Sequence, residues 1–237
     1  MVNFKIRIAD KVIEINAFNE KTKKYCENFL TEGNPDFIIT MNQEDLDNER
    51  NESSDGKVYV NEEISALYRK IANTLIEENI LVFHGSSFRY KDNGFIVTAH
   101  SGVGKSTHVR LLKEYLKDDL EYINDDKPLV VVSPNSAKIY SSPWNGKEKR
   151  GNNISSLLRS VIFLKRGETN TYKLLDNKED IYFRLLSQIY IPKDKLKAKK
   201  ALDLINLIVK TITFYEINVN MSEDAAKMTY NNIINVK

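Results

Sequence analysis

Cysteine is almost absent from this sequence, and long hydrophobic runs are absent altogether. The single cysteine, Cys26, has no partner for an internal disulfide, and no run of about 18 apolar residues is present to cross a membrane. Residues 1–15 lack the charged-then-apolar layout of a signal peptide. We therefore expect no membrane partner and a reducing, cytoplasmic setting.

An excess of one charge sign is also missing. The chain carries 35 lysines and arginines against 33 aspartates and glutamates, which leaves a formal net charge of +2. Because so small an excess produces no strong field, we expect no nucleic acid among the partners. The hydrophobic fraction of 41% is ordinary for a globular protein, and 237 residues suit one large domain or a core domain with a small appendage.

The sequence pattern of residues 1–60 predicts a small α+β appendage. Apolar and polar residues alternate on both sides of Ala9-Asp10, which indicates a β-hairpin over residues 4–15. A helix over residues 20–31 and a strand over residues 37–40 are expected to follow.

Residues 41–57 are polar and have few apolar anchors, so we expect a mobile surface loop there. This loop marks the approximate end of the appendage, and residues 61–237 are expected to form the main domain. The main domain alternates helix-like and strand-like runs, as α/β proteins do. The expected strands are 81–85, 94–99, 120–124, 128–133, 160–165 and 212–219, and the expected helices begin at Asn61 and Lys105, cover 179–189 and 194–209, and follow Ser222.

A phosphate-binding pattern lies between one of these strands and the next helix. Residues 99–107 read AHSGVGKST, the Walker A pattern, with alanine where the first glycine is commoner. The glycines allow backbone N–H groups to point at phosphate oxygens, the lysine reaches the β- and γ-phosphates, and the first hydroxyl can bind Mg²⁺. We expect the nucleotide, ATP or GTP, to be held by Ser101, Gly102, Val103, Gly104, Lys105, Ser106 and Thr107.

Acidic side chains follow a second predicted strand. Asp125 and Asp126 come after strand 120–124, at the edge where ligands collect in open α/β sheets. One carboxylate could orient or deprotonate a hydroxyl while the other holds the metal; the alternative is a solvated turn before Pro128. His84, at another strand end, could approach the phosphates and assist the catalytic aspartate, or could be structural.

The segment SSPWNGKEKRGNN, residues 141–153, contains the only tryptophan. It could present Trp144 as an aromatic face, cations to phosphate and the Glu148 carboxylate to a metal, or it could be an exposed basic turn. We favour a role in the site because the segment follows the strand that comes after the two aspartates. For Cys26 we expect packing as a small apolar side chain, and for His108 a surface or helix-packing role.

The segments FHGSSF, GFIVTAHSGVGKST, YINDDKPL, SSPWNGKE, RSVIFLKRG and ITFYEINV, in this order, resemble the catalytic domain of bacterial HPr kinase/phosphorylase and its shorter relatives. The resemblance covers roughly residues 80–235. It implies an α/β, P-loop-containing, phosphoenolpyruvate-carboxykinase-like fold with a mixed sheet and helices. It also implies a kinase that uses ATP and Mg²⁺ to phosphorylate a hydroxyl, a serine of a protein or peptide.

The resemblance also implies roles for individual residues. The catalytic residues would be Asp125 as general base, His84 and Lys105, and the metal ligands would be Ser106, Asp126 and Glu148. The resemblance does not extend to the family's N-terminal domain or to its glycine-rich signature. We therefore do not expect HPr itself as the acceptor of the phosphoryl group. A nucleotide-binding regulatory protein and a small-molecule kinase are the alternatives, and assembly as a homo-oligomer is compatible with each.

Overall fold

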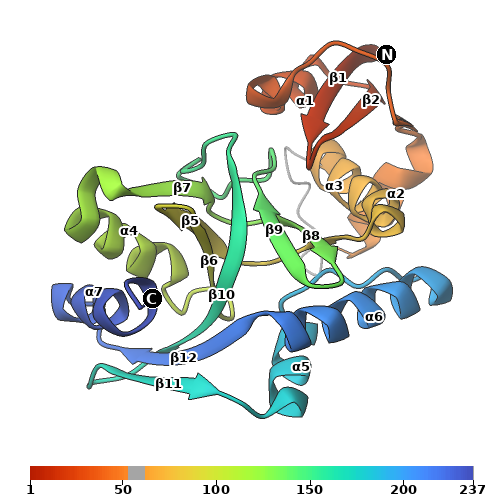
Figure 1. The fold of residues 1–237 in the computed structure, drawn as a ribbon. Coiled ribbons are helices and arrows are strands. Elements are labelled where there is room, and N and C mark those ends of the chain that lie inside the picture. The colour runs from red at the N-terminus through yellow and green to blue at the C-terminus, as the bar shows by residue number, and fades with distance from the viewer. Residues whose placement is uncertain (53–61, 237) are drawn as a thin grey trace.

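The N-terminal part of the protein is a small sheet with helices packed beside it (Figure 1). The structure, a computed structural model, describes residues 1–52 and 62–236. The elements of this part are β1 (Val2–Ile8), β2 (Lys11–Ala17), α1 (Glu20–Tyr25), β3 (Phe37–Thr40), α2 (Gln43–Glu52) and α3 (Glu62–Leu75).

The predicted hairpin is confirmed as β1 and β2. Ala9 and Asp10 adopt φ angles of 48° and 62°, as a two-residue turn between antiparallel strands requires. Strand β3 then pairs in parallel with β2. The predicted helix over residues 20–31 is shorter than expected, because α1 ends at Tyr25 and only a 3₁₀ turn, Glu27–Phe29, follows it.

Residues 43–52, predicted to belong to a mobile loop, form helix α2, so that prediction was wrong for them. The prediction relied on apolar anchors and overlooked a capping box. The Asp45 backbone N–H donates to Asn42 Oδ1 and the Asn42 backbone N–H donates to Asp45 Oδ2, each at 2.9 Å. Asp45 also pairs with Lys70 of α3 at 2.6 Å. Residues 53–57 of the predicted loop lie outside the described residues.

The hydrophobic core of the N-terminal part continues past residue 60. Ile64, Leu67 and Ile71 of α3 pack in one cluster with Ile6 of β1 and other apolar side chains of the small sheet. Helix α3 therefore belongs to the same core as the first 40 residues, and the division of the chain at residue 60 stays a prediction.

The main part is built on a nine-stranded mixed sheet. Strand order is β4-β8-β9-β10-β6-β5-β7, with β12 also paired to β10 and β11 paired to β12. Strands β5, β9 and β11 were not expected from the sequence. The elements are β4 (Ile80–Val82), β5 (Ser86–Tyr90), β6 (Asn93–Thr98), α4 (Lys105–Leu116), β7 (Leu120–Asn124), β8 (Leu129–Ser133), β9 (Ser136–Tyr140), β10 (Ser155–Arg166), β11 (Thr171–Leu175), α5 (Lys178–Leu186), α6 (Lys195–Thr211), β12 (Thr213–Val219) and α7 (Glu223–Thr229).

Helices cover both faces of this sheet, which is why its central strands are almost continuously apolar (Figure 1). Along β10, Val161 and Phe163 pack toward α5 and α6, whereas the alternate residues Ile162 and Leu164 pack toward α4 and α7. The expected α/β class with a mixed sheet is therefore what the structure shows. Within the described residues, no helix is both long enough and apolar enough to cross a membrane.

Candidate functional site

The segments that carry the predicted site residues meet at one edge of the main sheet. Strand β5 is antiparallel to both β6 and β7, so β6 and β7 run in the same direction and their carboxyl ends meet at that edge. Residues 99–107, which we call the Walker A segment, follow β6, and Asp125 and Asp126 follow β7. His84 precedes β5 at the same edge. The topology therefore brings these residues together, as ligand sites in open α/β sheets require.

The Walker A segment has a left-handed backbone at both of its glycines. Gly102 and Gly104 adopt φ angles of 80° and 120°, which disfavour side chains with a Cβ atom. A Cβ on Gly104 would also collide with Met221 Cε. Helix α4 begins directly after the second glycine, so its free N–H groups and positive dipole end point into the loop. Ser101 and Gly102 are exposed, whereas Val103, Ser106 and Thr107 are half-buried.

Lys105 is folded back onto its own loop. Its side chain is buried, and Nζ donates to the carbonyl oxygens of Ala99 at 3.0 Å and His100 at 3.4 Å. Burial lowers the pKa of Lys105, and the negative charges of Asp126 and Asp125 oppose this effect. The Lys105 amino group therefore lies close enough to both carboxylates to interact with their charges.

The Asp125 carboxylate is almost completely buried. Its residue is 6% exposed, and Oδ1 has no hydrogen-bond partner among the described residues. Burial raises the pKa of Asp125, and the nearby Ser86 and Ser106 hydroxyls and the Arg150 charge oppose this rise. A buried oxygen with no partner, close to the Ser106 hydroxyl, fits a divalent cation, which prefers oxygen ligands.

The Asp126 carboxylate is more open and faces His84. Asp126 Oδ1 lies 3.8 Å from His84 Nε2 and 3.4 Å from Lys127 Nζ. Burial, together with the charges of Lys127 and Lys105, lowers the pKa of His84 to about 4, so the imidazole is neutral at pH 7. The Gly85 backbone N–H donates to the Asp126 carbonyl at 3.0 Å, which ties these two strand ends together.

The loop over residues 141–153 supports the aspartates, although not with the predicted aromatic face. Trp144 is buried, and its Nε1–H donates to the Ile64 carbonyl at 3.2 Å. The prediction of an exposed aromatic face was therefore wrong, because the indole packs in the core formed with α3. The next residue, Asn145, accepts a 2.7 Å hydrogen bond from the Asp125 backbone N–H.

Glu148, predicted as a metal ligand, has an exposed side chain that pairs with Arg150 at 3.1 Å. Within residues 1–52 and 62–236, no group of three or more histidine, cysteine, aspartate or glutamate side chains is arranged to hold a metal ion. The described residues therefore do not combine Glu148 with Asp125 and Asp126 in one metal cluster. Arg150, by contrast, lies near Asp125, since its positive charge opposes the rise in the pKa of that carboxyl. The sequence alone did not reveal that these two residues are close.

Two of the remaining candidates have the structural roles expected of them. His108 is fully buried between α4 and α7, with Nε2 at 3.0 Å from Thr229 Oγ1. Cys26 is buried, and burial raises the pKa of its thiol to about 12. His100 lies in the Walker A segment with an exposed side chain. None of the three contributes a buried reactive group to the site.

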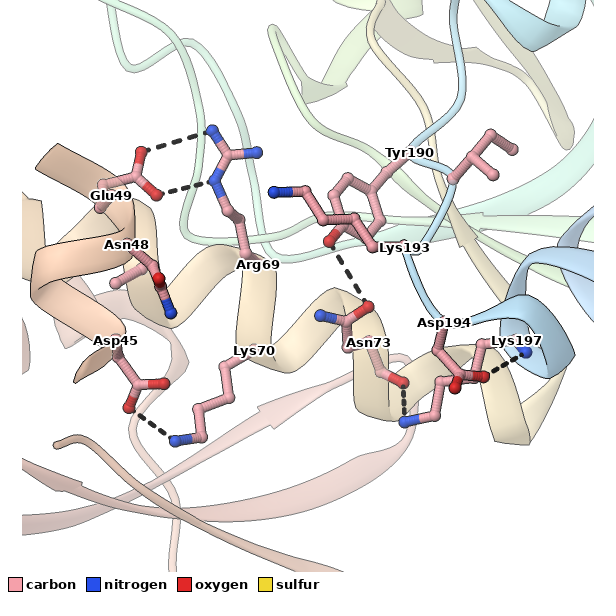
Figure 2. A pocket seen from close by; sticks show the side chains of 12 residues that line it. Asp45, Asn48, Glu49, Arg69, Lys70, Asn73, Tyr190, Lys193, Asp194 and Lys197 are labelled. Carbon is pink, nitrogen blue, oxygen red and sulfur yellow. Dashed lines mark hydrogen bonds and ion pairs between the residues drawn. The ribbon is translucent and has the colours of Figure 1, made fainter. Parts of the chain in front are cut away.

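A cavity of about 810 Å³ adjoins the Walker A segment on the side of β10. Its walls include Phe163 and Arg166 from the end of β10 and Gln188 after α5. A second cavity, of about 600 Å³, lies away from this site, between α2, α3 and residues 190–197 (Figure 2).

The second cavity is lined by charged side chains of both signs. Glu49 pairs with Arg69 at 2.7 Å, and Lys197 donates to the Asn73 carbonyl at 3.0 Å (Figure 2). Its described lining therefore includes acidic as well as basic side chains, in contrast to the cavity beside the Walker A segment.

Among solved structures, the chain is similar to the HPr(Ser) kinase/phosphatase from Coxiella burnetii, at 10% sequence identity and a TM-score of 0.38. The match covers 65% of this chain and 88% of that chain. No family model matches the sequence, and neither does any curated protein. A likeness this weak assigns neither a family nor an activity to the chain.

Proposed function

We propose that this protein is a kinase that transfers the γ-phosphoryl group of ATP to a hydroxyl, the serine of a protein or peptide. The observation that carries the proposal is the meeting of the Walker A segment with two different carboxylates at one sheet edge: buried Asp125 beside Ser106, and open Asp126 beside His84. Phosphoryl transfer requires a positioned nucleophile and neutralised phosphate charge, and this edge offers a group for each.

In this proposal the chain holds the phosphates mainly through backbone N–H groups of the Walker A segment and the start of α4. Lys105 leaves the Ala99 and His100 carbonyl oxygens when the nucleotide enters and pairs with the β- and γ-phosphates instead. Ser106 and Asp125 would hold Mg²⁺, which neutralises charge on the β- and γ-phosphates when it is bound. Arg150 lies close enough to Asp125 to add a positive charge on the same side.

We assign the general base to Asp126, which is the reverse of the roles that the sequence resemblance implies. The Asp126 side chain is 36% exposed, so an incoming hydroxyl can reach it, whereas Asp125 is enclosed. Neutral His84 faces the Asp126 carboxylate and would position it. In the step itself, the acceptor oxygen bonds to the γ-phosphorus, the bond to the β–γ bridging oxygen breaks, ADP leaves, and the hydroxyl proton passes to Asp126.

Transfer of labelled γ-phosphate from ATP to a protein or peptide, measured in a lysate of the source cell, tests the proposal. We expect Asp126→Asn to bind Mg²⁺-ATP normally and to lose about a hundredfold or more in transfer. We expect Asp125→Asn to lose the Mg²⁺ dependence of ATP binding. Asp92→Asn, an exposed change at the opposite end of the β5–β6 hairpin, is the matched control and is expected to behave as wild type.

Other outcomes separate the rival functions. Loss of transfer with normal metal-dependent binding in Asp125→Asn, but not in Asp126→Asn, would restore the original assignment of the base. Labelling of a small molecule instead of a protein band would indicate a small-molecule kinase. Tight ATP binding without transfer to anything would contradict the kinase proposal and favour a regulatory nucleotide-binding protein.

A further inference from the structure

The cavity beside the Walker A segment has no role in the phosphoryl-transfer step. It lies on the other side of the segment from the aspartates: in the sheet, β10 neighbours β6 on one side, and β5 and β7 lie on the other. Ala99, Gly102 and Val103 form part of the cavity wall, so the cavity is continuous with the loop that would hold the phosphates. A nucleotide with its γ-phosphate near Asp126 therefore has this cavity at its other end.

The size and lining of the cavity suit a flat apolar group. Its volume of about 810 Å³ lies within the range of ordinary small-molecule sites, roughly 300–1,000 Å³. Phe163, which packs toward α5, provides apolar surface, and Ser187 and Gln188 provide polar atoms at the wall formed by the turn after α5. The Gln188 side-chain oxygen is fixed by a 2.8 Å hydrogen bond from the Thr98 hydroxyl, so this wall is already ordered.

The charge of the cavity is complementary to a nucleotide. Lys165, Arg166 and Arg184 line it, and no acidic side chain is among the described residues of its wall. Glu216 pairs with both Lys165 and Arg184, at 2.8 and 2.5 Å, which holds these two in place. Arg166 is exposed and has no ion-pair partner among the described residues, so its charge is available to a phosphate.

We propose that this cavity holds the base and ribose of the bound nucleotide, with the base against Phe163 and the α-phosphate near Arg166. The nucleotide then lies across the Walker A segment, its nucleoside on the β10 side and its γ-phosphate on the β7 side. This inference rests on the proposed nucleotide-binding function and adds the subsite that distinguishes ATP from a bare polyphosphate.

Photolabelling with 8-azido-ATP in the presence of Mg²⁺ locates the base directly. We expect labelled peptides from residues 160–165 or 185–193, with protection by excess ATP. Protected label in residues 120–127 or 141–153 would overturn the proposal, because the base would then lie on the side of the aspartates. Absence of any ATP-protected label, together with no measurable ATP binding, would instead refute the proposed function itself.

Calorimetric binding of ATP and of inorganic tripolyphosphate gives a second measurement. Ser187→Leu adds bulk at an exposed position of the wall, and we expect it to weaken ATP binding about fivefold or more while tripolyphosphate binding stays unchanged. Ser133→Leu, exposed at the end of β8, is the matched control, and both affinities are expected to remain those of wild type. Equal binding of ATP and tripolyphosphate by wild type, or unchanged ATP binding by Ser187→Leu, would contradict the nucleoside subsite and leave the phosphate site standing.

Discussion

Protonation of His108 is expected to destabilise the helix that carries the Walker A lysine. The imidazole is fully buried between α4 and α7, Nε2 contacts the Thr229 hydroxyl, and Nδ1 has no partner among the described residues. Burial lowers its pKa from 6.5 to about 4. The unfolded chain therefore binds a proton at His108 at higher pH than the native protein, and the stability that the neutral ring contributes is complete above pH 6.5 and is lost as pH falls toward 4.

The size of this effect follows from the two pKa values. At pH 5 the unfolded state is almost fully protonated at His108 and the native state is about one-tenth protonated, which lowers the free energy of unfolding by about 2 kcal/mol relative to pH 7.5. Urea unfolding at the two pH values measures it. We expect His108→Gln to lose about 2 kcal/mol less than wild type over this interval, whatever its stability at pH 7.5.

Ser133→Ala, an exposed change that removes no titratable group, is the control and is expected to retain the wild-type dependence on pH. His84 also has a lowered pKa and contributes to the wild-type slope, so the comparison between variants isolates His108. An equal loss of stability in wild type and His108→Gln would refute the argument. So would a native-state NMR titration of the His108 ring with a midpoint near 6.5.

Three further predictions concern the loop, the thiol and the appendage. Gly104→Ala forces a Cβ into a φ of 120° and into contact with Met221, so we expect weaker ATP binding than in Gly33→Ala, which has a φ of 122° but open space; equal binding would contradict this. Cys26 is buried with a pKa raised to about 12, so it should react with Ellman's reagent only in urea, and rapid native reaction would disprove the burial. Glu63→Ala leaves buried donors near Thr22 unsatisfied and should lower the free energy of urea unfolding by about 3 kcal/mol, whereas a change below about 1 kcal/mol would show that water replaces the carboxylate.

The strand–loop–helix order around the Walker A segment could be predicted from the sequence because each part has a strong local signal. The apolar run before Ala99 predicts a buried strand, the glycines predict the loop, and the apolar spacing after Lys105 predicts the helix. The structure has β6, the positive φ angles and α4 at these places. The binding of nucleotide there stays a prediction.

Other elements depend on partners that a local pattern does not contain. Helix α2 is stabilised by its capping box and by ion pairs to α3, and its sequence is too polar for an apolar periodicity to reveal it. Strand β9 is short and pairs with both β8 and β10, so its neighbours determine it more than its composition does. The capping signal at Asn42 and Asp45 is the feature of the sequence that would have indicated α2.

The site residues show the same limit. Asp125 and Asp126 are adjacent in the sequence, and only the structure distinguishes an enclosed carboxylate beside Ser106 from an open one beside His84. Glu148 was expected at the metal because the resemblance places a carboxylate there, yet its side chain points to solvent and pairs with Arg150. The sequence gives the order of the residues in a loop but not the direction of each side chain. Arg150 of this loop approaches Asp125, whereas Glu148 does not.

A chain of contacts connects the N-terminal part to the two aspartates, although the sequence resemblance begins only near residue 80. Trp144 donates to the Ile64 carbonyl of α3, and its own carbonyl accepts the Lys127 N–H at 3.2 Å. Asn145 then accepts from the Asp125 N–H. Because these bonds are directional, the position of the aspartate turn depends on α3, and α3 is held by the core of the small sheet. The appendage is therefore part of the support of the site, and removing it would release the turn that carries both carboxylates.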